Sequence, residues 1–464
     1  MVLSFVIIYL LFTIAIGIFA NRYVKNSSDF MLAGKQLPMF VSASALFATW
    51  FGAETILGSS SEFVQHGLLG VIEDPFGAAL CLLLIGFFFA RPLYRMNLVS
   101  FGDFYKVKYG NTTEWMASFI LIISYFGWIA AQLVALGILF HQVADIDTST
   151  GIIIGACIVT LYTIIGGMWA VALTDTIQTI AIIVSLIIIA ILLTQKTEGF
   201  SSVIENTPDG FYRFTPKEPS AWLAYLATWI MIGFGSIPQQ DVFQRVMSSK
   251  SEKVAVQSSI WAGWMYLTIG LLPLYIGLCA YQIDPLAVHN KTQGFLPYAI
   301  EQHSGTFIQI LFFGAMISAI LSTASGAILA PSTILSENIL RKFFKNINDK
   351  QLLLSARISV LLIAAISLVM SFYESDIYDL VAGSSEITLV SLFVPMLAGL
   401  YFKKTSERAA MVSIVFGLAV WLILKINDVD ISRALYGFAA SWVGWLIGIY
   451  FPADRADFRR FFQR

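Results

Sequence analysis

Long apolar runs separated by short polar segments fill this chain of 464 residues. A helix needs about 20 apolar residues to cross the hydrocarbon core of a bilayer, and most of the runs approach or exceed that length. Such continuous runs are too long for membrane barrel strands, so the pattern predicts an all-α polytopic membrane protein of about thirteen spans. The predicted spans are 2–20, 40–62, 69–93, 114–140, 150–167, 170–194, 220–240, 257–283, 305–335, 355–373, 377–402, 408–425 and 433–451.

The composition supports a protein of the cell membrane. Hydrophobic residues make up 58% of the chain and charged residues only 12%, whereas soluble domains carry about 25% charged residues. The formal net charge of −1 offers no bulk attraction for nucleic acid. We therefore expect the lipid bilayer, and not a nucleic acid, to be the large-scale partner.

Lysine and arginine are distributed unevenly over the predicted loops. If the N-terminus lies outside, 22 of the 28 basic residues fall on the inner side and six on the outer side. Inner loops of membrane proteins carry an excess of Lys and Arg. The distribution predicts an outside N-terminus, an inside C-terminus and an odd number of spans.

Two predicted spans contain features that interrupt a helix. The sequences are TWFGAET at 49–55 and GFGSIPQQD at 233–241. Glycine and proline weaken the helical hydrogen-bond ladder, and the acids Glu54 and Asp241 are costly in a membrane unless they face water or a partner. Two interrupted helices at matching places, five helices apart, favour an inverted-repeat transporter with a binding site near the midplane. The alternative is that these glycines only allow close helix packing.

A cluster of hydroxyl residues lies in the predicted span 305–335. Ala319, Ser322 and Thr323 are spaced i, i+3 and i+4 and therefore share one helical face. Two hydroxyls with nearby carbonyls would form a neutral oxygen-lined site that suits Na⁺, a hard cation. The alternative is that these hydroxyls only bond to carbonyls of their own helix.

Two segments resemble the signature sequences of the sodium:solute symporter family. They are GGMWAVALTDTIQ at 166–178 and PMLAGLYFK at 395–403. Within the family the chain looks most like the high-affinity choline transporter branch, on the segments ATW (48–50), TLYTIIGG (160–167) and IPQQDVFQRV (237–246). The resemblance implies a leucine-transporter-type core of two inverted five-helix repeats, 40–194 and 220–402. These would lie in a single transmembrane domain, 1–451, followed by a short cytoplasmic tail, 452–464.

The resemblance also implies a sodium site. Carried over by position, its ligands would be the carbonyls of Ala48, Phe51 and Ala319 and the hydroxyls of Ser322 and Thr323.

Asp175 matches a family aspartate that is linked to sodium movement toward the cytoplasm. From the sequence alone, an acid in the first turn of a helix is also favoured by the helix dipole.

The substrate site is less well defined by the sequence. The choline branch holds a quaternary ammonium on aromatic faces, and Trp50 and Trp128 stand at two of the expected positions. Gln239 and Val381 stand at two others, so the cage is incomplete. Packing roles for the tryptophans and a solvated helix start for Glu73-Asp74 are the alternatives. The residues predicted to bind substrate are Trp50, Glu54, Thr55, Glu73, Asp74, Trp128, Gln239 and Gln240.

These observations predict a sodium-coupled symporter that imports a small polar organic solute by alternating access. Choline or another amine or amino-acid-like solute is favoured, with Na⁺ as the coupling ion and no organic cofactor. An enzyme is not expected, because the chain has neither an H-E-x-x-H nor a G-x-S-x-G motif. The alternative function is a membrane sensor of transporter fold that binds its ligand without transporting it.

Overall fold

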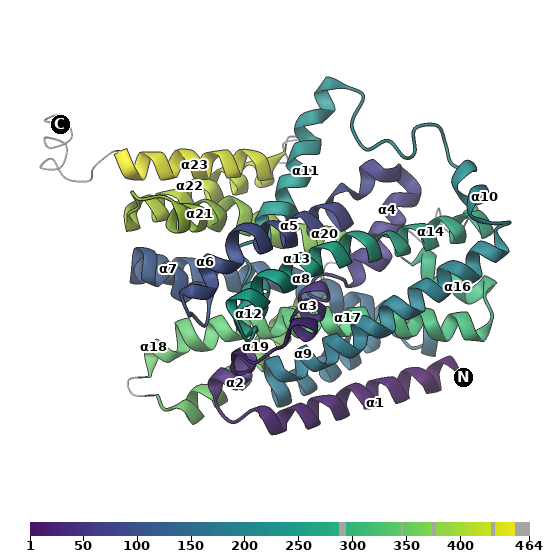
Figure 1. Cartoon of the computed structure of the whole chain (residues 1–464), viewed down its shortest axis with the longest axis horizontal. Helices are drawn as coiled ribbons and strands as arrows, with labels where there is room; N and C mark the ends of the chain where they lie inside the picture. Colours follow the sequence, from purple (N-terminus) through teal and green to yellow (C-terminus); the bar gives the residue numbers. More distant parts are fainter. Residues whose placement is uncertain (287–293, 345–346, 374–376, 428–431, 451–464) are drawn as a thin grey trace, which may run out of the picture.

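The computed structural model describes residues 1–464 except 287–293, 345–346, 374–376, 428–431 and 451–464. Its regular structure in the described ranges is helical, apart from one isolated β-bridge between Leu37 and Ser249. The predicted tail, 452–464, lies outside the described residues. Most of the long helices run side by side along the long axis of the molecule (Figure 1).

The first half of the chain contains ten helices that lead into or through the bundle. They are α1 (Val2–Ala20), α2 (Ser27–Leu32), α3 (Met39–Phe47), α4 (Ser59–His66), α5 (Ala78–Leu84), α6 (Ala90–Arg95), α7 (Phe101–Tyr109), α8 (Asn111–Ala144), α9 (Thr148–Lys196) and α10 (Phe200–Glu205). Wider π-helical turns continue three of these segments: η3 (Glu54–Gly58), η5 (Ile72–Gly77) and η6 (Ile85–Phe89).

The second half has the same character. Its helices are α11 (Trp222–Gly235), α12 (Gln240–Ser248), α13 (Glu252–Ile269), α14 (Leu271–Ile283), α16 (Phe295–His303), α17 (Thr306–Ile334), α18 (Arg341–Phe343), α19 (Asp349–Met370), α20 (Ile377–Thr388), α21 (Val394–Tyr401), α22 (Glu407–Ile426) and α23 (Arg433–Tyr450). The π-helical turns here are η8 (Leu335–Leu340) and η9 (Leu389–Phe393).

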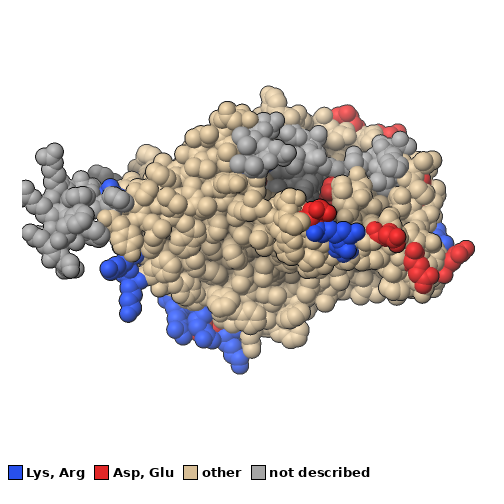
Figure 2. Space-filling view, turned by 90° about the horizontal axis from the view of Figure 1, so that it is seen from above, with Lys and Arg blue, Asp and Glu red and all other residues tan. Residues whose placement is uncertain are grey.

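The outer surface is that of a protein surrounded by lipid. Nine helices in the described ranges are long and apolar enough to cross a membrane, or ten if one bent pair is counted as a span. Many large apolar side chains are exposed on them, such as Ile8 at 65% and Leu361 at 52%. Figure 2 shows a broad uncharged surface, with most of the visible charged side chains toward its two ends. Both features fit a bilayer environment.

Helix α9 contains a break that the spacing of apolar runs predicted. Its 49 residues would reach about 70 Å if straight, more than twice the hydrocarbon core. Gly167, with φ +51°, interrupts the helical geometry between the predicted spans 150–167 and 170–194. A Cβ at this position would lie 2.5 Å from the Phe30 carbonyl oxygen, so glycine meets both a conformational and a spatial need. The total of thirteen spans and the membrane orientation stay predictions.

Both predicted helix interruptions are confirmed. Helix α3 ends at Phe47, residues 48–52 are not helical, and helical structure resumes at about Ala53. Helix α11 ends at Gly235 and α12 begins at Gln240 after a bend of 45°. The breaks leave backbone groups outside the helical ladder in the interior of the protein.

Helix α17 is central in the bundle and α1 is peripheral. In the most apolar stretch of Thr306–Phe343, 78% of residues are buried, against 22% in Val2–Tyr23. Helix α17 contacts α1, α8, α9, α12 and α19. Side chains on several faces of α17 are therefore positioned by protein contacts rather than by lipid.

Close packing near the C-terminal end of the core gives a first prediction. A Cβ at Gly417 on α22 would lie 1.7 Å from the Val390 carbonyl oxygen in η9. We expect Gly417→Ala to force these segments apart and lower the free energy of unfolding by about 1–3 kcal/mol. Thermal unfolding of the detergent-purified protein measures this effect. Gly305→Ala is the matched control, because no heavy atom lies within 4 Å of its added Cβ; equal melting temperatures for the two variants would contradict the prediction.

Candidate functional site

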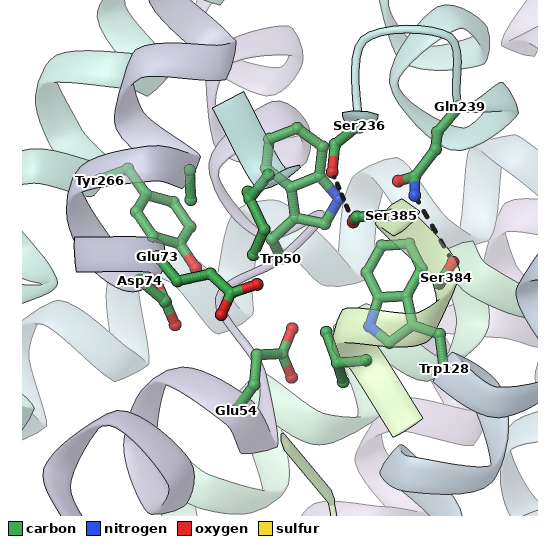
Figure 3. A pocket seen from close by; sticks show the side chains of 13 residues that line it. Trp50, Glu54, Glu73, Asp74, Trp128, Ser236, Gln239, Tyr266, Ser384 and Ser385 are labelled. Carbon is green, nitrogen blue, oxygen red and sulfur yellow. Dashed lines mark hydrogen bonds between the residues drawn. The ribbon is translucent and has the colours of Figure 1, made fainter. Parts of the chain in front are cut away.

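A small cavity lined by both apolar and polar side chains lies beside both helix breaks (Figure 3). The space open to the centre of a water molecule is about 30 Å³, which is room for about two waters. The lining side chains come from both interrupted segments and from the helices packed around them. They are Trp50, Glu54, Glu73, Asp74, Ala78, Trp128, Ile232, Ser236, Gln239, Tyr266, Val381, Ser384 and Ser385.

Three carboxylates face this cavity, and all three are buried. Glu54 is 5% exposed, Glu73 4% and Asp74 3%. Asp74 Oδ2 accepts hydrogen bonds from Thr55 Oγ1 at 2.6 Å and Ser59 Oγ at 3.1 Å. Among the described residues, no donor meets strict hydrogen-bond geometry at Glu54 Oε1 or Asp74 Oδ1. Buried acids with unpartnered oxygens mark a functional site in a membrane protein, since such groups are costly to retain.

Aromatic side chains form part of the wall around the acids. Figure 3 shows Glu54 and Glu73 extending into the space flanked by Trp50 and Trp128, with Tyr266 on the side of Asp74. The Trp128 indole is buried and interacts with the Glu54 carboxyl group. A positive group in this space would therefore meet carboxylates and aromatic faces together.

The structure separates some residues that the sequence grouped as substrate ligands. Gln239 lines the cavity, and its Nε2 lies 3.5 Å from Ser384 Oγ. Gln240 instead directs its side chain to the first residue of α7, where its Oε1 accepts from Phe101 N at 2.8 Å. Thr55 is not among the lining residues; its hydroxyl bonds to Asp74 and lies 2.7 Å from the Tyr266 hydroxyl.

The first helix break also meets the hydroxyl face of α17. Thr323 Oγ1 donates to the Ala48 carbonyl at 3.3 Å, across a sequence separation of 275 residues. Ser322, one residue earlier, donates to Asp175 Oδ1. Phe51 and Ala319 are fully buried in the same two segments. The two segments predicted to share a sodium ion are thus in direct contact.

The donor chemistry of this contact fits a small hard cation. Oxygens bound at right angles, each about 2.4 Å from a Ca²⁺-sized ion, lie about 3.4 Å apart. The Thr323–Ala48 oxygen pair is 3.3 Å apart. In this pair a neutral hydroxyl and a carbonyl face each other, so the contact suits a monovalent ion better than a divalent one.

Asp175 is buried in an ion pair next to this contact. Its Oδ2 lies 3.3 Å from Arg245 Nη2, and the two side chains are 0% and 2% exposed. A Cβ at Gly326 would lie 2.3 Å from Arg245 Nη2, so this glycine leaves room for the guanidinium. The pair connects α9 to α12, and Ser322 connects it to α17. Asp175 therefore links α9, α12 and α17 next to the predicted sodium ligands.

The ion pair gives a second prediction. Arg245→Met leaves Asp175 buried without a countercharge, which we expect to lower the free energy of unfolding by about 3–5 kcal/mol. The double variant Asp175→Asn with Arg245→Met should recover most of the loss. Thermal unfolding of wild type, both single variants and the double variant measures the coupling. If Asp175 acts in sodium release, the double variant should regain stability but should still show slower sodium-driven uptake than wild type.

One residue that the sequence reasoning missed links the cavity to the first helix break. Gln132 on α8 donates from Nε2 to Glu54 Oε2 at 2.8 Å and accepts from the Ala53 backbone N–H at 3.2 Å. A Cβ at Gly52 would lie 2.7 Å from Thr323 Oγ1 and 2.9 Å from both Gln132 Oε1 and Glu54 Oε2. The signal was available, because Gln132 is an amide within an apolar helix.

Four polar residues that line the cavity were also missed. Ser236 lies within the second interrupted segment, and Ser384 and Ser385 form a polar pair in the predicted span 377–402. Those three positions carried a local signal, since consecutive polar residues are unusual in a lipid-facing helix. Tyr266 carried none, because nothing in its neighbourhood shows that α13 turns it toward the cavity.

Two broken helices, a hydroxyl-bearing helix against the first break and a buried cavity with three carboxylates are typical of helical secondary transporters. Two solved structures share this fold. A Na⁺-coupled sialic acid symporter in an outward-open state superposes with a TM-score of 0.84 over 97% of this chain and 98% of its own, at 19% identity. MhsT in complex with L-phenylalanine superposes with a TM-score of 0.55 over 88% of this chain and 97% of its own, at 15% identity.

The family follows from the sequence comparison. The profile of the sodium:solute symporter family matches residues 30–417, and the chain belongs to this family. The high affinity choline transporter 1 of Homo sapiens is 27% identical over 89% of this chain and 75% of its own length. The high-affinity choline transporter 1 of Drosophila melanogaster is 29% identical over 87% and 67%. The high-affinity proline transporter PutP of Bacillus subtilis is 25% identical over 94% of each.

Membership in this family establishes the general function of the protein. The protein is a multi-pass sodium-coupled symporter of the cell membrane, in a family of transporters rather than enzymes. A small-molecule substrate and sodium are its transported partners.

Proposed function

We propose that this symporter imports a small organic amine together with Na⁺. The observation that carries the proposal is the group of three buried carboxylates, Glu54, Glu73 and Asp74, on one cavity. None of the described lining residues is Lys, Arg or His. An ammonium group on the substrate would stabilise carboxylates at this depth, where an ionised acid without a partner is costly.

The two tryptophans support a cationic substrate independently of the acids. Trp50 and Trp128 flank the cavity, and an alkylammonium between indole faces gains a cation–π attraction. The relatives named as choline transporters and as a proline transporter act on solutes with a positively charged nitrogen. Their names support the class of solute, while the particular substrate follows from the chemistry of this cavity.

Sodium binds, in this proposal, between the carbonyls of Ala48, Phe51 and Ala319 and the hydroxyls of Ser322 and Thr323. Binding there fixes the broken segment 48–52, which carries Trp50 on its cavity side. The amine then binds to an organised site, and its binding favours closure. Because coupling is a reciprocal free energy, the amine should tighten sodium binding by the same factor.

Uptake into proteoliposomes tests the function. We expect an inward sodium gradient to stimulate uptake of at least one amine from a labelled set, and an equal potassium gradient to have no such effect. Equal uptake under both gradients would contradict sodium coupling. Amine binding without uptake would instead indicate the sensor alternative.

A further inference from the structure

We infer that Glu54 is the charged partner of the transported sodium ion and serves as one of its ligands through Oε2. The inference rests on the proposed sodium site and adds to it a carboxylate, which the ligand set implied by the family resemblance lacks. It is carried by the position of Glu54 beside the first helix break, by the charges around this break and by the side chains that hold the carboxylate there.

Two oxygens from different elements converge beside Gly52, in the first break. A Cβ at this residue would lie 2.7 Å from Thr323 Oγ1 and 2.9 Å from Glu54 Oε2. Because glycine has no side chain, the hydroxyl on α17 and the carboxylate on η3 face the same small space. Oxygen ligands lie about 2.3–2.6 Å from a Ca²⁺-sized ion. Shifts of a few tenths of an ångström would therefore let one ion contact both oxygens.

The predicted ligand set gives the ion no countercharge, because its carbonyls and hydroxyls are all neutral. A cation in a membrane interior is costly to bury without an opposite charge close to it. Asp175, which accepts from Ser322, already pairs with Arg245 at 3.3 Å. The countercharge for the ion has to come from another acid at the break.

Glu54 is an acid at this place without a positive partner in the described part of the chain. Its side chain is 5% exposed. The side chains that act on its carboxylate are the Gln132 amide, the Trp128 indole and Asp74. Of these only Asp74 is charged, and its charge has the same sign. A sodium ion and Glu54 would therefore stabilise each other in the interior.

Helix α8 fixes the carboxylate on the side of the break. Gln132 Nε2 donates to Glu54 Oε2 at 2.8 Å, and Gln132 Oε1 accepts from the Ala53 backbone N–H at 3.2 Å. One amide thus ties the carboxylate to the residue that follows Gly52. Because the amide is neutral, it orients Glu54 without cancelling the charge that the ion requires.

Asp74 has a separate set of contacts. Its Oδ2 accepts from Thr55 Oγ1 at 2.6 Å and from Ser59 Oγ at 3.1 Å, and Figure 3 shows it beside Tyr266 and apart from Glu54. Thr55 directly follows Glu54, so successive residues of η3 direct one side chain to α8 and the next to Asp74. A sodium ion at Glu54 leaves Asp74 for the nitrogen of a monovalent amine, and each cation then has one carboxylate.

Sodium binding measured without any amine tests the inference. The purified protein is unfolded thermally over a sodium series, with potassium holding the ionic strength constant. We expect Glu54→Gln to raise the sodium concentration for half-maximal stabilisation at least about tenfold, because the amide keeps the side-chain shape and removes its charge. Glu54→Asp keeps the charge and should give a smaller increase.

Glu386→Gln is the matched control for the loss of a buried carboxylate. Glu386 is 6% exposed, and its Oε2 accepts from Trp421 Nε1 at 2.9 Å and from Arg433 Nε at 3.1 Å, outside the cavity. This variant should keep the wild-type sodium dependence even where its melting temperature falls. A cooperative unfolding transition without sodium verifies that each variant is folded.

The outcomes separate the inference from the proposed function. If sodium stabilises wild type and Glu54→Gln with the same half-maximal concentration, the inference is overturned and sodium-coupled amine symport stands. If sodium does not stabilise even the wild type, the proposed sodium site fails and the inference fails with it. Equal increases in Glu54→Gln and Glu54→Asp would show that charge is not the cause, and would also overturn the inference. An increase of the same size in Glu386→Gln would do so as well.

Discussion

Thr323→Val is expected to raise the sodium concentration for half-maximal stabilisation or uptake by about tenfold or more. The substitution removes the hydroxyl that lies 3.3 Å from the Ala48 carbonyl and keeps a similar side-chain shape. Loss of one oxygen ligand at a buried site is worth about 1–3 kcal/mol, and 1.4 kcal/mol corresponds to a factor of ten. The effect should appear in thermal unfolding of the purified protein over a sodium series, with potassium holding the ionic strength constant.

Two further variants make this result specific. Thr323→Ser keeps the hydroxyl and should stay close to wild type. Ser332→Ala lies on the same helix, where its hydroxyl donates to the Ile328 carbonyl at 2.6 Å, and should leave the sodium dependence unchanged. A sodium dependence in Thr323→Val equal to that of wild type would remove this residue from the ion site.

Gln132→Leu is expected to weaken the coupling between sodium and the substrate by about tenfold. The side chain holds Glu54 Oε2 and the Ala53 N–H at the same time, at 2.8 and 3.2 Å. Without it, ordering of the break by sodium is no longer transmitted to the carboxylate in the cavity. Typical coupling free energies of about 1–3 kcal/mol set the size of the effect.

The measurement compares substrate affinity with and without sodium in wild type and in Gln132→Leu. The ratio of the two affinities should fall in the variant, and by reciprocity the effect of substrate on sodium affinity should fall by the same factor. Ser124→Ala is the matched control on α8, because its hydroxyl bonds to the Leu121 carbonyl. A variant that loses affinity for both ligands while keeping their ratio would show a structural role only.

The sequence predicted those parts of the site that have recognisable local sequence features. Glycine, proline and acids inside apolar runs located both helix breaks, and i, i+3, i+4 spacing placed Ser322 and Thr323 on one face. Trp50 lies within the first break and Glu54 follows it directly, and both reach the cavity.

The other site residues could not be predicted, because their place in the site depends on how each helix is rotated about its own axis. In lipid a helix can be apolar on every side, so its pattern does not show which face turns inward. Tyr266 meets Thr55 across 211 positions in the chain, and no local feature marks that contact. The neighbouring amides Gln239 and Gln240 point in different directions at the start of α12. Gln239 faces the cavity, and Gln240 accepts a hydrogen bond from Phe101 N.

All nine residues of α12 are buried, and its side chains include Asp241, Gln244 and Arg245. The helix is two-sided, with its charged and amide side chains on one face and Val242, Phe243, Val246 and Met247 on the other. Water reaching the first face would hydrate groups that are costly to bury, whereas water reaching the second would meet a wholly apolar surface. The short segment after the second break can therefore border water on one side only, while its other side stays packed against protein.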